Sequence, residues 1–177
     1  MDIKEYQKAA LTTAIFPASV KIIYPSWGLM GELGEFSNKI KKIIRDNNFR
    51  IDDDNRLHAM LELGDIMWYA VVLLNSVGLE PEKYNTTHRN ISEGDATLIS
   101  FETFSDLCDK CLSFTKAAKN YHSRPIILKR SFVELVCDVE ILAGQLGYTL
   151  EQVMQANIDK LASRAKRGTI GGSGDDR

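Results

Sequence analysis

Apolar residues recur at every third or fourth position along most of the chain. This spacing is that of an α-helix with one buried face. No segment shows the strict alternation of apolar and polar residues that marks a half-buried strand. The pattern therefore predicts an all-α protein, a bundle of about six helices. The expected helices span about residues 3–16, 27–46, 56–77, 98–121, 127–146 and 149–167.

Prolines, glycines and polar turns mark the expected helix boundaries. Pro17 should stop the first helix, and the polar turn 52–55 should cap the third, which Gly78 is placed to end. Pro81 is expected to open a further short helix, followed by a polar surface loop. Residues 1–167 are predicted to form one domain. The Gly-rich residues 168–177 are predicted to form a flexible C-terminal tail.

Composition and charge narrow the functional classes. The 177 residues are 44% hydrophobic and 26% charged, which is typical of a soluble globular domain. A formal net charge of -2 gives no positive field for a nucleic acid polymer. The N-terminus lacks an apolar signal core, and the longest apolar run, 66–74, is too short to span a bilayer. We therefore expect a cytoplasmic protein without a membrane partner.

Two short acidic motifs stand out. Glu32 and Glu35 are three residues apart on the second predicted helix, and Glu62 and Asp65 have the same spacing on the third. Residues three apart are neighbours on one helix face, so each motif presents two carboxylates side by side. If the two helices are antiparallel neighbours, all four carboxylates can converge between them.

The apolar surroundings of the second motif favour a metal-binding site. Glu62 and Asp65 are the only acidic residues between Leu57 and Leu79, in a helix otherwise rich in apolar residues. A buried, ionised carboxylate costs several kcal/mol unless it is paired or binds a metal, and that stretch contains no Lys or Arg. We therefore expect a divalent cation to supply the charge. Ligands that are all oxygen favour Mg²⁺ or Mn²⁺.

Two other interpretations compete for these carboxylates. A di-iron site needs Glu-x-x-His on two helices, whereas His58 precedes Glu62 by one turn. Solvated charge is the ordinary interpretation of Glu32 and Glu35 taken alone, and the apolar setting of the second motif favours metal binding. A glycine next to an acid in both motifs costs helix stability. It would allow close helix approach or a bulky ligand.

The last predicted helix carries a polar and basic face. Asn157, Lys160 and Arg164 lie at positions i, i+3 and i+7, and such donors suit a phosphate chain. A solvated basic helix end, favoured by the helix dipole, is the alternative. The glycines at 171–174 lack the Lys-Ser/Thr of a P-loop. They favour a flexible flap over a substrate.

Taken in order, these motifs resemble one family. Glu-x-x-Glu, then Glu-x-x-Asp with an apolar run containing Trp-Tyr, then Asn-x-x-Lys-Leu-x-x-Arg, is similar to the MazG-like all-α nucleoside triphosphate pyrophosphohydrolases. The residues that carry the resemblance lie in 27–78 and 147–177. The ending 171–177 is also similar to MazG-like proteins of bacteria and phages.

The resemblance implies a helical bundle, a homo-oligomer (dimer or tetramer), and Mg²⁺-dependent hydrolysis of a nucleoside triphosphate to a monophosphate and pyrophosphate. A water that is metal-bound or oriented by a carboxylate would attack the α-phosphorus, with Glu35 accepting its proton. The implied metal ligands and catalytic residues are Glu32, Glu35, Glu62 and Asp65. The implied phosphate-binding residues are Asn157, Lys160 and Arg164, which Lys39 and Lys42 could assist. As aromatic residues, Trp27, Trp68 and Tyr69 could stack on the base. Aromatic residues at helical spacing also serve as core.

One departure from the family pattern has structural consequences. Residues 81–146 separate the second acidic helix from the Asn-x-x-Lys helix and add roughly two helices. They would close the bundle within one chain, replacing part of a partner subunit. Two alternatives stay open: a phosphoribosyl-ATP pyrophosphohydrolase, and a helical interaction module without catalysis.

Overall fold

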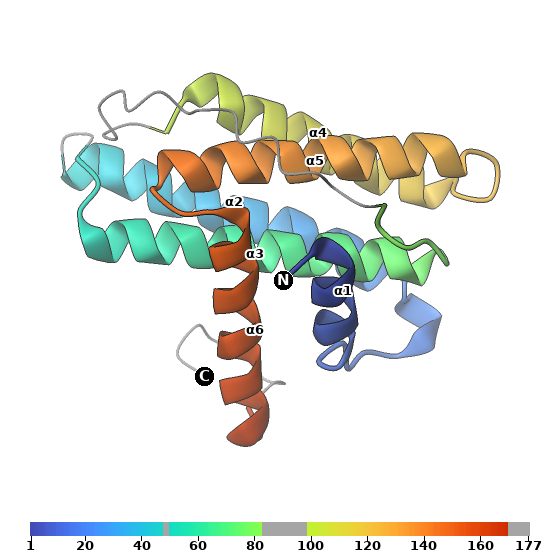
Figure 1. The fold of residues 1–177 in the computed structure, drawn as a ribbon. Coiled ribbons are helices and arrows are strands. Elements are labelled where there is room, and N and C mark those ends of the chain that lie inside the picture. Colours follow the sequence, from blue (N-terminus) through green and yellow to red (C-terminus); the bar gives the residue numbers. More distant parts are fainter. Residues whose placement is uncertain (48–49, 83–98, 170–177) are drawn as a thin grey trace.

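A computed structural model describes residues 1–47, 50–82 and 99–169, and these contain only helices and connecting segments, with no strand. The prediction of an all-α protein with about six helices is confirmed. The helices are α1 (Ile3–Leu11), α2 (Ile23–Asp46), α3 (Asp53–Ser76), α4 (Phe101–Lys119), α5 (Pro125–Gln145) and α6 (Leu150–Lys166), with a short 3-10 helix, η1, at Ala18–Val20 (Figure 1).

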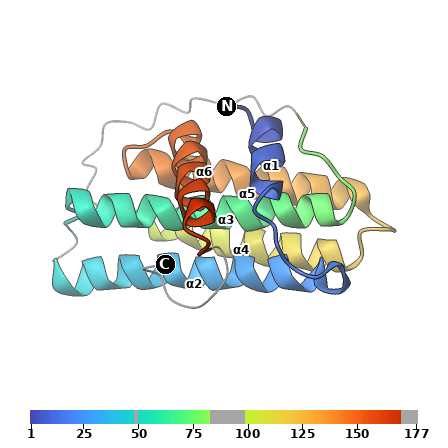
Figure 2. The ribbon, with the colours of Figure 1, turned by 90° about the horizontal axis from the view of Figure 1, so that it is seen from below.

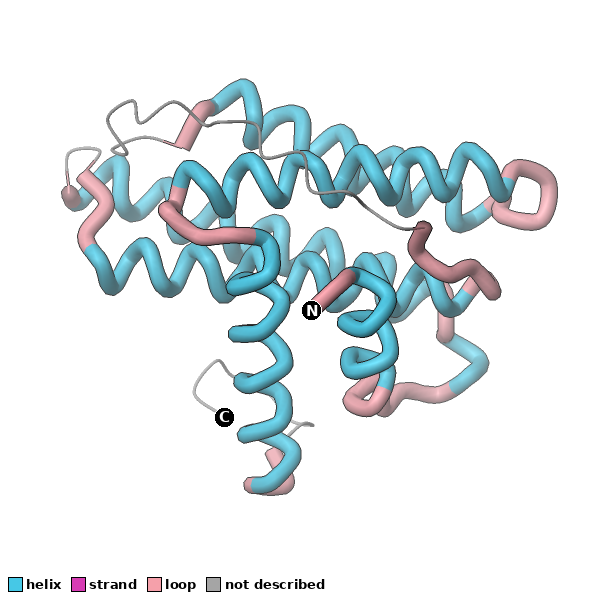
Figure 3. The backbone as a smooth tube through the Cα atoms, in the orientation of Figure 1, coloured by secondary structure: helices cyan, strands magenta, loops and turns pink. Residues whose placement is uncertain are grey.

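Four long helices, α2 to α5, run side by side along one axis, while α1 and α6 lie across α3 on one side of this bundle (Figures 1, 2 and 3). Helix α4 packs on α5 and α2, and α5 packs on α3 and α6. The two helices predicted for the intervening segment are thus α4 and α5. They complete a four-helix arrangement within a single chain.

Helix α3 is the centre of the fold and contacts α1, α2, α5 and α6. Its run from Ile66 to Trp68 and from Ala70 to Leu74 is buried throughout. By length and composition α3 could cross a membrane, yet 67% of its most apolar window is buried inside the fold. Its hydrophobicity is therefore accounted for by its central position.

The observed helix ends follow the local chemistry. Asp52 caps α3 by accepting a hydrogen bond from the Asn55 amide (2.8 Å). Gly78, which ends α3 as predicted, and Gly147, which follows α5, have φ of 77° and 81°, a left-handed conformation that favours glycine. Helix α2 begins before the predicted Trp27, because its first turn tolerates Pro25.

Three other predictions differ from the structure or lie partly outside the described residues. Helix α1 ends at Leu11 rather than near residue 16, and the Thr12 and Thr13 hydroxyls donate to the Ala9 and Ala10 carbonyls where the helix stops. Residues 81–82 are not helical, and the rest of the predicted short helix lies outside the described residues. In the predicted tail, Gly168 and Thr169 close α6, and residues 170–177 lie outside the described residues.

Candidate functional site

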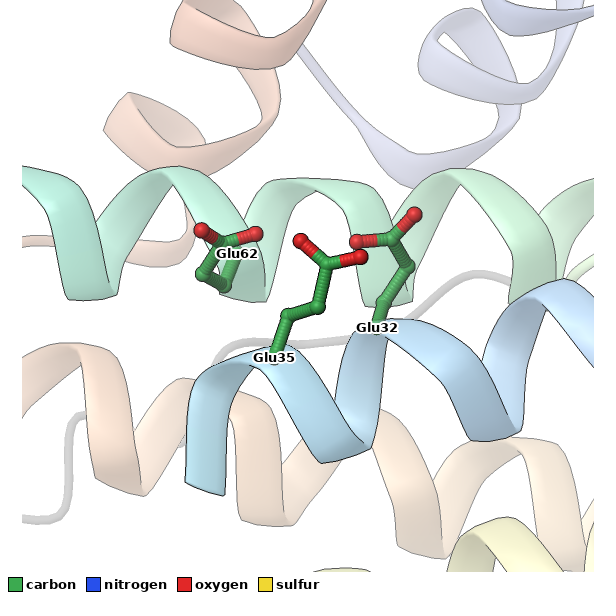
Figure 4. A group of neighbouring side chains, drawn as sticks. All are labelled: Glu32, Glu35 and Glu62. Carbon is green, nitrogen blue, oxygen red and sulfur yellow. The ribbon is translucent and has the colours of Figure 1, made fainter. Parts of the chain in front are cut away.

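The first acidic motif and part of the second meet between α2 and α3. Carboxylate oxygens of Glu32, Glu35 and Glu62 all lie within 4.8 Å of one another. Figure 4 shows the carboxylate of Glu35 between those of the other two residues. Glu35 is exposed, whereas Glu32 and Glu62 are half-buried. The cluster therefore combines two half-buried carboxylates with one that is exposed to solvent.

Asp65, the fourth predicted ligand, lies next to this cluster but is held by α6. The Asn157 side-chain amide donates a hydrogen bond to Asp65 Oδ1 (2.8 Å), and the Lys160 ammonium pairs with Asp65 Oδ2. The side chains of Asp65 and Lys160 are only 17% and 21% exposed. The structure thus brings three of the predicted ligands together and places the fourth in a polar network beside them.

Two lysines reach the acidic site. Lys160 approaches from α6, and Lys39 Nζ lies 3.4 Å from Glu62 Oε1. The expectation that these buried carboxylates have no protein cation nearby was therefore wrong. It considered only the sequence of α3, whereas both lysines come from other helices that the fold brings against it.

The lysines leave the cluster under-neutralised. Burial, followed by the charges of Asp65, Glu35 and Glu62, raises the pKa of Glu32 to about 8, and Lys160 only partly opposes this. Burial also raises the pKa of Glu62, with Asp65 as the next cause and Lys39 opposing. Glu32 therefore holds a proton at neutral pH in the ion-free protein, and a cation that binds there would displace it.

The donor set fits a divalent cation. Mg²⁺ prefers oxygen ligands in octahedral geometry, in which neighbouring and opposite oxygens are about 3 to 4 Å apart. The Glu32, Glu35 and Glu62 oxygens lie within 4.8 Å of one another, close to this range. No histidine or cysteine belongs to this group of described residues, which argues for a hard cation over zinc.

The predicted phosphate-binding residues divide into two groups. Lys39 and Lys160 are half-buried and contact the acidic site. Arg164 is half-buried on the same face of α6 as Lys160, and Lys42 is exposed one turn beyond Lys39. Asn157 is fully buried and accepts a hydrogen bond from the Tyr6 hydroxyl (2.8 Å) while it donates to Asp65. Its observed contacts are internal, so the structure gives it a positioning role.

The two tryptophans also differ. Trp27 on α2 is 76% exposed and is available to stack on a ligand. Trp68 is buried, and its indole N–H donates to the Thr13 hydroxyl (3.0 Å) and the Ala10 carbonyl (3.2 Å). Trp68 therefore fastens α1 to the core and is not presented to a base in this structure.

The glycines in the two motifs serve different ends. A Cβ on Gly64 would lie 3.0 Å from the Asn157 Cβ and 3.3 Å from the Val153 carbonyl, so glycine permits the close approach of α6 to α3. Gly34 has no other described atom within 4 Å of an added Cβ. The close-approach explanation thus holds for Gly64, and the ligand explanation stays open for Gly34.

Two contacts near the site had no signal in the sequence. The Tyr69 ring packs so closely on α2 that a Cβ at Gly28 would lie 2.0 Å from it. Tyr6 was identifiable as part of a buried helix face with Ile3, Gln7 and Ala10. The target of its hydroxyl depends on the crossing of α1 and α6 over α3, which a single sequence does not reveal.

Comparison with known proteins shows that the chain is similar to a phage protein. No model of a known protein family matches the chain, and no solved structure matches it. The Gene 37 protein of Mycobacterium phage L5 is 40% identical over 99 residues, which cover 52% of this chain and 85% of the phage protein. The chain belongs to the family of that protein. The name of the Gene 37 family describes no activity, so the chemistry rests on the geometry of the acidic site.

Proposed function

We propose that this chain is a Mg²⁺-dependent nucleoside triphosphate pyrophosphohydrolase with a MazG-like fold. It would convert a nucleoside or deoxynucleoside triphosphate and water into the monophosphate and pyrophosphate. The observation that carries the proposal is the cluster of Glu32, Glu35 and Glu62, whose carboxylate oxygens lie within 4.8 Å of one another. Glu32 and Glu62 are half-buried, and lysine neutralises the cluster only in part. Such a cluster suits a cation that also binds phosphate oxygens.

Each side chain has a role in this reaction. Glu32 and Glu62 would hold the cation, and Asp65, fixed by Asn157 and Lys160, would complete the acidic wall. Glu35, the exposed carboxylate, would accept the proton of the attacking water. The water oxygen ends on the α-phosphate, and the bond from the α-phosphorus to the bridging oxygen breaks, which releases pyrophosphate.

The positive groups have a role in substrate binding. Bound Mg²⁺ or Mn²⁺ supplies charge to the phosphate oxygens and acidifies water. Lys39 and Lys160, each now paired with a carboxylate, can exchange that partner for a phosphate oxygen of the triphosphate. Trp27 is exposed on the same helix as Glu32, where it can stack on the base.

A helical interaction module without catalysis is the second candidate. It is favoured by the pairing of Lys39 with Glu62 and of Lys160 with Asp65, which offsets part of the site charge without any ion. Exposed apolar residues Ile23, Trp27 and Met30 on α2 would then bind a partner.

Pyrophosphate release from a panel of nucleotides, with and without Mg²⁺, tests the proposal. The panel includes phosphoribosyl-ATP, which separates the related enzymatic alternative. We expect Mg²⁺-dependent pyrophosphate release that falls by at least about a hundredfold in Glu62→Gln and Asp65→Asn. The matched control is Glu134→Gln, an acid on α5 paired with Arg130 and Lys110. Absence of turnover with every nucleotide would favour the interaction module.

A further inference from the structure

A buried hydrogen-bond chain links α1 to the acidic site. The Tyr6 hydroxyl donates to Asn157 Oδ1 (2.8 Å), and Asn157 Nδ2 donates to Asp65 Oδ1 (2.8 Å). Tyr6 and Asn157 are both 0% exposed, so the bond between them is shielded from solvent, whereas the bond to Asp65 is part-buried. The carbonyl oxygen of Gly64, the residue that precedes Asp65, is a second and more distant acceptor for the Tyr6 hydroxyl (3.3 Å).

The orientation of the Asn157 amide decides whether the Asp65 carboxylate faces a hydrogen-bond donor or an acceptor. The two ends of an amide have nearly the same shape but opposite hydrogen-bonding character. With its N–H₂ toward Asp65, the amide donates to the carboxylate; if rotated by half a turn, it would place its oxygen against that carboxylate. A proton donor at the far end of the amide favours the first orientation, and the Tyr6 hydroxyl is that donor.

Tyr6 is suited to remain a donor. Burial, with the charge of Asp65 as the second cause, raises the pKa of Tyr6 well above its usual value, so the hydroxyl keeps its proton. Helix α1 itself is fastened to α3, because the Gln7 amide donates to the Val71 carbonyl (3.0 Å) and Trp68 donates to the Ala10 carbonyl (3.2 Å). These two bonds hold α1, and with it the Tyr6 hydroxyl, in place on α3.

We propose that Tyr6 is a positioning residue of the acidic site: it fixes the amide of Asn157, which in turn orients Asp65 and its partner Lys160. This inference rests on the proposed metal site and extends it to a helix that contributes no ligand. It predicts that loss of one hydroxyl on α1 weakens cation binding between α2 and α3 without removing any carboxylate.

Binding of Mn²⁺ to the nucleotide-free protein tests this directly. Titration followed by the electron paramagnetic resonance of free Mn²⁺ reports affinity without any turnover. In Tyr6→Phe we expect the dissociation constant to rise by about tenfold to a hundredfold, the range found when residues that orient ligands are changed. In pyrophosphate release, the Mg²⁺ concentration for half-maximal rate should rise in parallel, while KM for the nucleotide at saturating Mg²⁺ stays within about twofold.

The control and the double variant separate positioning from general stability. Tyr148→Phe removes the hydroxyl of a half-buried tyrosine in the turn between α5 and α6 and should leave Mn²⁺ affinity unchanged. In an Asn157→Ala background, Tyr6→Phe should have no further effect on affinity, because the intermediate group is gone. Additive losses in the double variant, or wild-type affinity in Tyr6→Phe, would overturn the inference.

Gly64→Ala provides a second approach if Tyr6→Phe does not fold. An added Cβ presses on Asn157 while the Tyr6 hydroxyl remains, so Mn²⁺ affinity should fall in the same direction; unchanged affinity would overturn the inference. Failure of the proposed function is distinguishable. It would appear as absent Mn²⁺ binding and absent turnover in the wild-type protein, whereas failure of this inference leaves wild-type binding and turnover intact.

Discussion

At the scale of single residues, Glu32 shows the strongest conflict between burial and charge in the acidic site. Its pKa is raised from 4.5 to about 8 in the metal-free protein, so the folded chain holds this proton more tightly than the unfolded chain. The stabilisation from that proton is complete below about pH 4.5 and is lost as the pH rises toward 8. Metal-free protein should therefore become less stable over this window.

Glu32→Gln tests that conclusion. The variant cannot ionise, so its metal-free stability should change less between about pH 5 and pH 8. At about pH 8 it should exceed the wild-type free energy of unfolding by on the order of 2 kcal/mol. Urea midpoints in the presence of a chelator measure this, and Glu134→Gln on α5 should keep the wild-type slope. An identical slope in Glu32→Gln would contradict the account.

Lys160 is predicted to stabilise the metal-free site and to compete with a cation. Lys160→Met leaves Asp65 with Asn157 alone, and we expect a loss of about 1 to 3 kcal/mol of unfolding free energy, reduced by the partial exposure of the pair. Mn²⁺ affinity should be unchanged or higher, because a competing positive group is gone, while pyrophosphate release should fall. A weaker Mn²⁺ affinity in Lys160→Met would contradict this role.

For single residues, the sequence predicts three carboxylates that meet and a polar face on α6 that includes Asn157 and Lys160, but it does not predict that these two side chains bind Asp65. The i, i+3 spacing of Glu32 and Glu35, together with the apolar setting of Glu62, is a local signal and identified the three clustered acids. The pairing of Lys160 with Asp65 and the contact of Tyr6 with Asn157 both depend on helix crossings. Those crossings depend on packing between distant segments and leave no periodic trace in a single sequence.

At the scale of elements, alanine substitutions at two glycines of α2 should change the free energy of unfolding in opposite directions. Gly28→Ala forces the Tyr69 ring away from α2, and we expect a net loss of about 1 to 2 kcal/mol. Gly34→Ala meets no other described atom within 4 Å and should gain about 0.5 to 1 kcal/mol from helix propensity. Urea unfolding of both variants measures the difference. Equal effects of the two substitutions would contradict the close packing of α2 on Tyr69.

The order of the helices along the chain was predictable from the sequence, whereas the angles at which they cross one another were not. Apolar periodicity located the six α-helices of the described residues, because each buries apolar side chains. The end of α1 was placed too late, since the apolar residues Ala14 to Phe16 continue past its last turn without forming helix. That α1 and α6 cross α3, while α2, α4 and α5 run along it, depends on close contacts such as that between Gly64 and Asn157.

At the scale of the whole molecule, the acidic site should couple cation binding to folding. A cation that binds only the folded chain stabilises it by about 2.7 kcal/mol at a hundred times its dissociation constant. For a chain of this size, that corresponds to a rise of roughly 5 to 10 °C in the melting temperature. Thermal melts in millimolar Mg²⁺ or Mn²⁺ should show this rise in the wild type and lose it in Glu62→Gln. Equal shifts in both proteins would indicate binding elsewhere.

The most direct measurement of the central claim follows the oxygen of water into the products. Incubation of the protein with Mg²⁺ and deoxynucleoside triphosphates in ¹⁸O-labelled water, with mass spectrometry of the products, identifies the phosphorus that is attacked. We predict ¹⁸O in the nucleoside monophosphate and unlabelled pyrophosphate, with both products lost in Glu62→Gln. Free phosphate as the product, label in pyrophosphate, or turnover that survives Glu62→Gln would contradict it.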